Sequence, residues 1–316
     1  MNSPRLDIYC MAIGGTGMAP LACLLQEQGH AVRGTDGPLY PPMSTLLEGA
    51  GIRPTVGYDP AHLEPRPDLV VIGNAIRRDN PEAVEVERQG IPYLSMPQAL
   101  SRFFLESRRP LVVAGTHGKT TTTAMAAWVY AQCGADPGFL IGGVPRDLPV
   151  SFHAGTGERF VVEGDEYNAA YFDRGPKFLH YRPDTLILTS VEYDHADLYA
   201  SPEALHAAYA ELIRLLPPTG YLVACGDTPK VRELAALARC PVLFYGVDQR
   251  GESNDLHPLG GIEAMEEGSR FRVRDVDAGE VEISLRLVGG HNVSNALAVW
   301  AAARRDGLPA DRVAAA

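Results

Sequence analysis

The sequence has no long apolar run. Nowhere in its 316 residues is there an uninterrupted stretch of about 18 apolar residues, the length that a membrane-spanning helix requires. Residues 1–15 also lack the charged segment, apolar run and cleavage site of a secretory signal. We therefore expect no association with a membrane and a cytoplasmic location.

Cysteine and positive charge are also scarce. The five cysteines are scattered and none has the CxxC spacing, which disfavours a disulfide framework and a zinc site. Lys and Arg number 28 against 39 Asp and Glu, so the formal net charge is −11. An acidic chain without a basic stripe is not expected to bind nucleic acid. Any anionic ligand must be held by local features such as helix N-termini, glycine loops and a few placed cations.

What the sequence does contain is an alternation of short apolar runs and amphipathic stretches. In the first third, strands are expected at 6–13, 31–35, 68–72 and 91–94, and helices at 18–28, 43–50 and 81–89. This alternation predicts an α/β fold, here a Rossmann-like domain with a mostly parallel sheet. The polar segment 106–110 suggests a boundary, so we expect domains at 1–107 and 108–316.

The second domain repeats the alternation and then departs from it. Strands are expected at 111–114, 160–163, 185–191, 221–225 and 242–245, and helices at 119–133, 202–216 and 293–305. Segments 270–276 and 281–287 are short and alternating, which is typical of antiparallel hairpins. We therefore predict a P-loop-type parallel α/β domain with a small antiparallel β addition.

The strongest motif is a glycine loop between a strand and a helix. Residues 112–123 read VVAGTHGKTTTT. In a P-loop, backbone N–H groups wrap the phosphates, the lysine reaches the β- and γ-phosphates and the following hydroxyl coordinates Mg²⁺. The loop is shorter than the GxxxxGK[ST] form, because Val113 stands where the first glycine would be. The predicted contacts of ATP are Gly115, Thr116, His117, Gly118, Lys119, Thr120 and Thr121.

Two further strands end in acidic residues. One is followed by Glu163, Asp165 and Glu166, and the other by the segment 192–197, EYDHAD. Ligands of open parallel sheets bind outside the carboxyl ends of the strands, where carboxylates can hold the Mg²⁺ of ATP. We predict that Thr120, Glu163 and His195 bind this metal. For Asp165 and Glu166 a solvated acidic loop is an equal alternative, and a lone histidine is more often a surface residue.

Two weaker motifs lie at the two ends of the chain. Residues 13–18, IGGTGM, follow the first strand, and Asp36 ends the second, where a dinucleotide fold places a ribose-binding acid. This loop could serve NAD, FAD or another pyrophosphate compound, or be a structural turn. The last helix opens with GGHNVSNA at 289–296. Helix capping explains one polar residue in this segment but not three together. Amide side chains can form hydrogen bonds with the edge of an adenine base.

In this order the motifs resemble those of the Mur ligases. That family combines a glycine-rich UDP loop, GTxGKT, an acidic strand end, a DH(x)D segment and GxHNxxN. The corresponding parts of this sequence are 14–18, 115–120, Glu163, 194–197 and 289–295. Stretches 40–47, 71–75, 142–145 and 171–199 are most similar to the branch that joins a recycled murein tripeptide to UDP-N-acetylmuramate. Where several members carry a carbamylated lysine this chain has Ala210, as in that branch and in the L-alanine-adding branch.

The resemblance implies an ATP-dependent amide ligase of peptidoglycan metabolism. ATP would phosphorylate the lactyl carboxylate of UDP-N-acetylmuramate, and the amine of L-Ala-γ-D-Glu-meso-diaminopimelate would then displace the phosphate. The implied catalytic residues are Lys119, Glu163 and His195, and the implied adenine contacts are His291, Asn292 and Asn295. The implied contacts of the UDP-sugar are Gly15, Thr16, Gly17, Met18, Asp36, Asn74, Asp165 and Glu166.

The family's third domain would follow Ala316, and this sequence does not contain it. We therefore expect this chain alone to bind UDP-N-acetylmuramate and ATP weakly without joining the peptide. Three alternatives stay open. They are the L-alanine ligase with the same motifs, a nicotinamide-dependent oxidoreductase using the 13–18 loop, and a non-catalytic nucleotide-sugar-binding module. The sequence makes no prediction of an oligomer.

Overall fold

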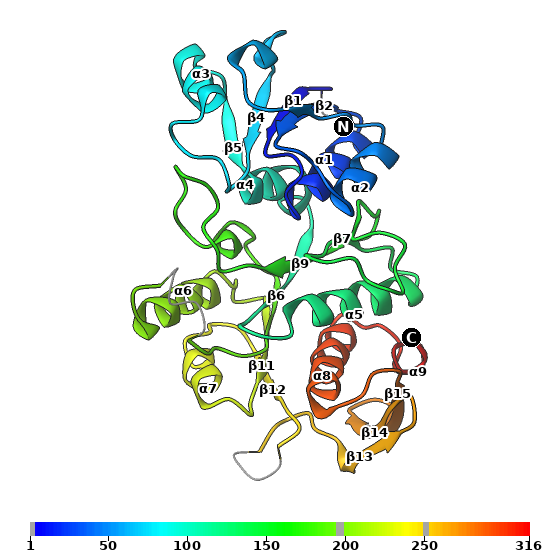
Figure 1. Cartoon of the computed structure of the whole chain (residues 1–316). Helices are drawn as coiled ribbons and strands as arrows, with labels where there is room; N and C mark the ends of the chain where they lie inside the picture. Colours follow the sequence, from blue (N-terminus) through cyan, green and yellow to red (C-terminus); the bar gives the residue numbers. More distant parts are fainter. Residues whose placement is uncertain (1–3, 194–198, 249–252) are drawn as a thin grey trace.

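The computed structural model describes residues 4–193, 199–248 and 253–316 (Figure 1). Its N-terminal part is a parallel sheet of order β3-β2-β1-β4-β5 with helices packed on it. The elements are β1 (Asp7–Met11), α1 (Met18–Glu27), β2 (Ala31–Asp36), α2 (Met43–Gly49), β3 (Thr55–Val56), η1 (Pro60–Leu63), β4 (Leu69–Ile72), α3 (Pro81–Gln89) and β5 (Tyr93–Ser95). None of the helices in the described part of the chain combines the length and apolar character needed to cross a membrane.

Helix α3 shows how local chemistry sets the ends of an element. The Asn80 side chain accepts hydrogen bonds from the N–H groups of Glu82 and Ala83, so it caps two donors that the first turn leaves free. Pro81 occupies the first helical position, where its missing N–H costs nothing. Gly90 ends the helix in the left-handed conformation, with φ of 61°. The predicted bounds of this helix are confirmed.

The second part begins after helix α4 (Met96–Leu100) and the π-helical segment η2 (Ser101–Leu105). Its elements are β6 (Arg109–Ala114), α5 (Lys119–Gln132), β7 (Gly138–Leu140), β8 (Phe152–His153), β9 (Arg159–Gly164), η3 (Lys177–His180), β10 (Thr185–Leu188), α6 (Pro202–Arg214), β11 (Tyr221–Cys225), α7 (Pro229–Ala235) and β12 (Val242–Tyr245). The sheet order is β12-β11-β10-β6-β9-β7-β8, parallel except for the β7–β8 pair.

A three-stranded antiparallel sheet follows the parallel one. It consists of β13 (Leu259–Met265), β14 (Gly268–Asp275) and β15 (Gly279–Leu285). Helices α8 (Gly290–Arg305) and α9 (Ala310–Ala315) come after it, and α8 packs against α5. The predicted α/β class, with its Rossmann-like first part, parallel second part and small antiparallel addition, is therefore confirmed.

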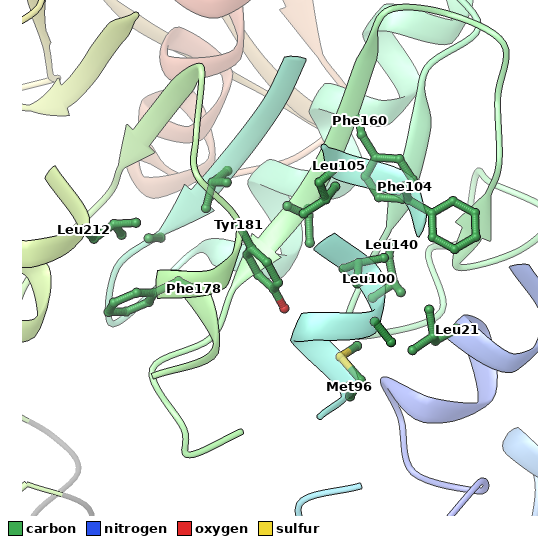
Figure 2. Packing of buried hydrophobic residues seen from close by; sticks show 14 of the residues in the cluster. Leu21, Met96, Leu100, Phe104, Leu105, Leu140, Phe160, Phe178, Tyr181 and Leu212 are labelled. Carbon is green, nitrogen blue, oxygen red and sulfur yellow. The ribbon is translucent and has the colours of Figure 1, made fainter. Parts of the chain in front are cut away.

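Apolar side chains of α4 and η2 join the two parallel sheets. Figure 2 shows Met96, Leu100 and Phe104 packed between Leu21 on one side and Phe160 on the other. The Phe104 and Phe160 ring centroids are 6.0 Å apart. Because these side chains belong to one buried cluster, the two sheets share a continuous core on this side.

Some elements differ from the prediction. The strand expected at 185–191 ends at Leu188, and the hydroxyl of the next residue, Thr189, donates to the His117 carbonyl oxygen. Helix α7 and strands β7, β8 and β13 were not predicted. Each is short or rich in glycine and charge, so none carries a periodic apolar pattern of its own.

An ion pair fastens the antiparallel sheet to α8 and leads to a pH prediction. Arg304 donates from Nε to Asp275 Oδ2 at 2.6 Å, and this hydrogen bond lowers the pKa of Asp275 from 3.8 to about 2. A carboxyl whose pKa is lower in the folded state stabilises the fold above its unfolded pKa, and the contribution disappears as the pH falls through the folded value. We expect the unfolding free energy to fall between pH 4 and pH 2, and to fall less in Asp275→Asn. Urea denaturation at several pH values tests this, and parallel curves for the two proteins would contradict it.

Candidate active site

The loop between β6 and α5 requires glycine at two positions. Gly115 has φ of 141° and Gly118 has φ of 78°, both in the region that side chains other than glycine rarely adopt. A Cβ atom on Gly115 would collide with the Thr189 hydroxyl, and one on Gly118 would lie 2.9 Å from Asn295 Oδ1. The loop is therefore packed closely between the end of β10 and helix α8.

Residues after β10 already occupy two N–H groups of this loop. Thr116 donates its N–H to the Ser190 carbonyl oxygen at 2.9 Å, and His117 donates its N–H to Ser190 Oγ at 3.0 Å. Thr116 Oγ1 also donates to the Glu192 carbonyl oxygen at 3.1 Å and accepts the Glu192 N–H at 2.8 Å. The donors best placed for a phosphate are then those at the start of α5, whose first-turn N–H groups have no partner within the helix.

Lys119 lies folded over the loop. Its Nζ donates to the carbonyl oxygens of Gly115 at 2.7 Å and Thr116 at 3.2 Å. It also pairs with Glu166 Oε2 at 3.1 Å, where the two side chains are 14% and 1% exposed. Glu166 was predicted as a contact of the sugar, whereas here its buried carboxylate is a counter-ion of Lys119. The sugar contact stays a prediction.

Thr120, at the start of α5, and Glu163, near the end of β9, lie in contact with each other. Thr120 Oγ1 donates to Glu163 Oε1 at 2.9 Å, and the Gly142 N–H donates to Glu163 Oε2 at 3.0 Å. Burial raises the pKa of Glu163 above its ordinary value, although both hydrogen bonds and the Lys119 charge act in the opposite direction. A half-buried carboxylate beside a hydroxyl suits a hard divalent cation such as Mg²⁺, whose positive charge would compensate that of the carboxylate.

The third predicted metal ligand, His195, lies outside the described residues. Within the described ranges, no three His, Cys, Asp or Glu side chains gather closely enough to hold a metal. Glu163 and Thr120 fit two of the predicted positions, and the metal site stays a prediction.

The other glycine loop follows β1 in the N-terminal sheet. Asp36 accepts the N–H of Gly14 through Oδ2 and that of Gly37 through Oδ1, each at 2.7 Å. Asp36 therefore shapes the loop in addition to any contact with a ligand. Gly15 and Thr16 are exposed, whereas the Met18 side chain is buried in the core and can offer a ligand only its backbone.

Three other predicted residues are Gly17, Asn74 and Asp165. Gly17 and Asp165 contact other parts of the chain, whereas Asn74 is exposed. Gly17 packs on Met96, whose Cε would lie 2.8 Å from a Cβ at that glycine. Asn74 is exposed just after β4. Asp165 pairs with Lys177 at 2.7 Å. These residues follow strands of the two parallel sheets, and their contacts with the UDP-sugar stay a prediction.

Helix α8 brings one of its three predicted residues to the P-loop. Asn295 is buried against Gly118, whereas His291 is exposed and the Asn292 side chain donates to the Val288 carbonyl oxygen at 2.9 Å. Beside them, a mostly apolar cavity of about 400 Å³ opens between α5, α8 and β15, with Thr120 and Thr121 on its border. The adenine contacts stay a prediction.

Sequence reasoning missed Thr189 and Ser190, which hold the P-loop from the neighbouring strand. The Thr189 hydroxyl donates to the His117 carbonyl oxygen at 2.6 Å. The only signal in the sequence was the change from apolar to polar residues after Leu188, and this change does not identify the partner segment.

Comparison with known proteins gives consistent matches. The pattern of the Mur ligase family catalytic domain matches residues 7–108, and that of the Mur ligase middle domain matches residues 113–303. The UDP-N-acetylmuramate–L-alanyl-γ-D-glutamyl-meso-2,6-diaminoheptandioate ligase of Escherichia coli K12 is 43% identical over 308 residues, covering 97% of this chain and 66% of that protein. The UDP-N-acetylmuramate–L-alanine ligase of Rubrobacter xylanophilus is 37% identical, with 95% and 63% covered.

Solved structures agree with these matches. The crystal structure of the UDP-N-acetylmuramate:L-alanyl-γ-D-glutamyl-meso-diaminopimelate ligase from Neisseria meningitides has a TM-score of 0.88 and 38% identity, and the match covers 99% of this chain and 97% of that one. The murein peptide ligase of Psychrobacter arcticus has a TM-score of 0.87 and 38% identity, with 98% and 67% covered. The chain spans about two thirds of the length of the curated relatives it matches.

Proposed function

Because the chain belongs to the Mur ligase family, we propose that it carries the nucleotide-sugar and ATP sites of a ligase that joins UDP-N-acetylmuramate to L-Ala-γ-D-Glu-meso-diaminopimelate. The observation that carries the proposal is the arrangement of Lys119, Thr120 and Glu163 at one sheet edge, in a chain 43% identical to a ligase named for these substrates. The domain division at 107/108 and the cytoplasmic location stay predictions.

The chemistry requires two steps because a free carboxylate has no good leaving group. The lactyl carboxylate oxygen attacks the γ-phosphorus of ATP, the bond to the bridging oxygen breaks, and ADP leaves. The peptide amine then attacks the carbonyl carbon of the acyl phosphate, loses a proton, and phosphate leaves with the electron pair. Charge on the transferred phosphoryl group is what the protein must neutralise.

This chain's residues supply that neutralisation in the proposed site. Lys119 Nζ now contacts two loop carbonyl oxygens and Glu166, and it would instead bind a phosphate held on the first turn of α5. Thr120 and Glu163 would hold Mg²⁺, whose charge would screen that of the phosphates. Ser190 and Thr189 would keep the loop in this conformation while Lys119 moves to the phosphate.

Because the chain spans about two thirds of its relatives' length, the test uses two proteins. The chain alone is assayed for binding of UDP-N-acetylmuramate by calorimetry. A fusion of the chain to the unmatched part of the Escherichia coli relative is assayed with UDP-N-acetylmuramate, Mg·ATP and either the tripeptide or L-alanine. We expect binding by the chain and an amide product with the tripeptide, detected by mass spectrometry together with released phosphate.

The outcomes separate the candidates. A product with L-alanine alone would assign the chain to the L-alanine ligases, to which it is 37% identical or less among the relatives compared. Absence of UDP-N-acetylmuramate binding would overturn the proposal. Binding of the nucleotide sugar without consumption of ATP by the fusion would favour a non-catalytic binding module.

A further inference from the structure

The loop that follows β9 reaches the N-terminal sheet (Figure 1). Tyr171 OH donates to Glu87 Oε1 on α3 at 3.0 Å. The Phe172 ring packs edge-on against Tyr93 of β5, with centroids 4.9 Å apart. The same loop begins with Glu166, the partner of Lys119, so it spans the distance from the P-loop to the edge of the other sheet.

A cavity of about 680 Å³ lies between this loop and the segment after β4. We call it the arginine pocket, and its lining residues are Ile76, Arg77, Arg78, Tyr171, Phe172 and Arg174. Half of this lining is arginine and a third is aromatic, in a chain whose net charge is −11. A local excess of positive charge in an acidic protein is the feature that anion binding would require.

Two of the three arginines are not neutralised by carboxylates. Arg77 pairs with Asp79 at 3.3 Å, and both side chains are exposed. Across residues 4–193, 199–248 and 253–316, no ion pair involves Arg78 or Arg174. Burial and the hydrogen bond to Glu87 raise the pKa of Tyr171 to about 12 against the opposing charge of Arg78. Tyr171 therefore stays neutral, and it lines the pocket together with Arg78.

The pocket lies at the ligand-binding edge of the N-terminal sheet. Strands β1 and β4 are parallel neighbours, and β1 is followed by the 13–18 glycine loop. Gly73, just after β4, packs on that loop, because a Cβ atom there would lie 3.1 Å from the Met11 carbonyl oxygen and 3.3 Å from Met18 Cγ. The arginines thus begin four residues beyond a direct contact with the glycine loop. In an open parallel sheet, ligands bind in this crevice.

We propose that Arg78 and Arg174 bind a phosphate or carboxylate group of a substrate of the proposed reaction. The rings of Tyr171 and Phe172 would pack against the part of that substrate next to the bound group. The parallel N–H donors of a guanidinium group match two oxygens of a phosphate or of a carboxylate. The inference rests on the proposed function, which supplies two sources of such groups: the diphosphate of UDP-N-acetylmuramate and the carboxylates of the tripeptide. Because Gly73, which begins the segment that carries Arg78, lies against residues at both ends of the glycine loop, the diphosphate is the source that we expect.

The test measures binding of both ligands to the 316-residue chain by calorimetry. The variants are Arg78→Ala, Arg174→Ala, the double variant and Arg78→Lys, which keeps the charge but loses the parallel N–H donors. Arg53→Ala is the matched control, since Arg53 is an exposed arginine of the same N-terminal part and has no ion pair in the described ranges. Thermal melts of all variants check that folding is unchanged.

We expect each alanine variant to weaken UDP-N-acetylmuramate binding on the order of 10-fold, the lysine variant to recover part of the loss, and the control to bind like the parent. A loss confined to the tripeptide would instead identify carboxylates as the group bound. Unchanged affinity of the double variant for both ligands would overturn the pocket proposal alone. Failure of the parent chain to bind UDP-N-acetylmuramate would overturn the proposed function, and the pocket proposal with it.

Discussion

Lys119→Ala is expected to weaken ATP binding to this chain by roughly 10- to 100-fold, as removal of a charged hydrogen-bond donor typically does. In the fused protein it should also slow amide formation by roughly 10²–10³-fold, because the lysine would stabilise charge on the transferring phosphoryl group. Nucleotide binding is measured by calorimetry with a nonhydrolysable ATP analogue and Mg²⁺, and the rate by release of phosphate. Binding of UDP-N-acetylmuramate should remain that of the parent.

The ion pair between Lys119 and Glu166 calls for a control variant. Removal of Lys119 takes away an ionic partner of Glu166, which is 1% exposed, so part of any loss could reflect a disturbed loop. The double variant Lys119→Ala, Glu166→Gln removes both charges. If the lysine acts on the phosphates, nucleotide binding stays weak in the double variant. Recovery of tight binding there, or near-parental turnover in the single variant, would refute the assignment of Lys119.

The second large effect is expected on stability. Arg159, at the start of β9, donates from Nε to Asp306 Oδ2 at 2.6 Å, with side chains 6% and 8% exposed. Tyr130 OH on α5 donates to the same oxygen at 2.5 Å. Asp306→Ala leaves the buried guanidinium with less compensation, since Asp184 is its remaining carboxylate partner. Breaking a buried ion pair from one side typically costs about 3–5 kcal/mol, and we expect a loss of that order in urea denaturation.

Asp311→Ala is the matched control for Asp306→Ala. Asp311 is exposed in the first turn of α9, five residues further along the chain. Its removal should change the unfolding free energy by no more than about 0.5 kcal/mol, as surface substitutions usually do. If Asp306→Ala also changes the unfolding free energy by less than about 1 kcal/mol, the Arg159–Asp306 ion pair does not stabilise the fold as predicted.

The predictable parts of the protein were those whose signals are local. Helix α3 was predicted at 81–89, and its bounds are set by Asn80, Pro81 and Gly90, which act within a few residues of the helix ends. The P-loop was located from an apolar strand, two glycines and the Lys119–Thr120 pair, since its conformation depends on backbone freedom at those glycines. Glu163 was placed at a sheet edge because the carboxyl ends of parallel strands share one edge.

The parts that could not be predicted depend on contacts between distant segments. The Glu166 contact with Lys119 joins residues 47 positions apart, and the Ser190 contact with His117 joins residues 73 positions apart. The arginine pocket brings the segment after β4 to a loop almost a hundred residues later in the chain. No periodicity or motif encodes such pairings, because they arise from the order and spacing of the strands.

The sequence alone determined the fold class, the order of the elements and the family, because apolar periodicity, glycine positions and motif spacing are properties of neighbouring residues. Only the tertiary structure decided which carboxylate faces Lys119, which hydroxyls hold the P-loop, and where uncompensated arginines gather. The physical reason is that burial and charge pairing depend on which surfaces the parallel sheets bring together, and chain order does not specify these.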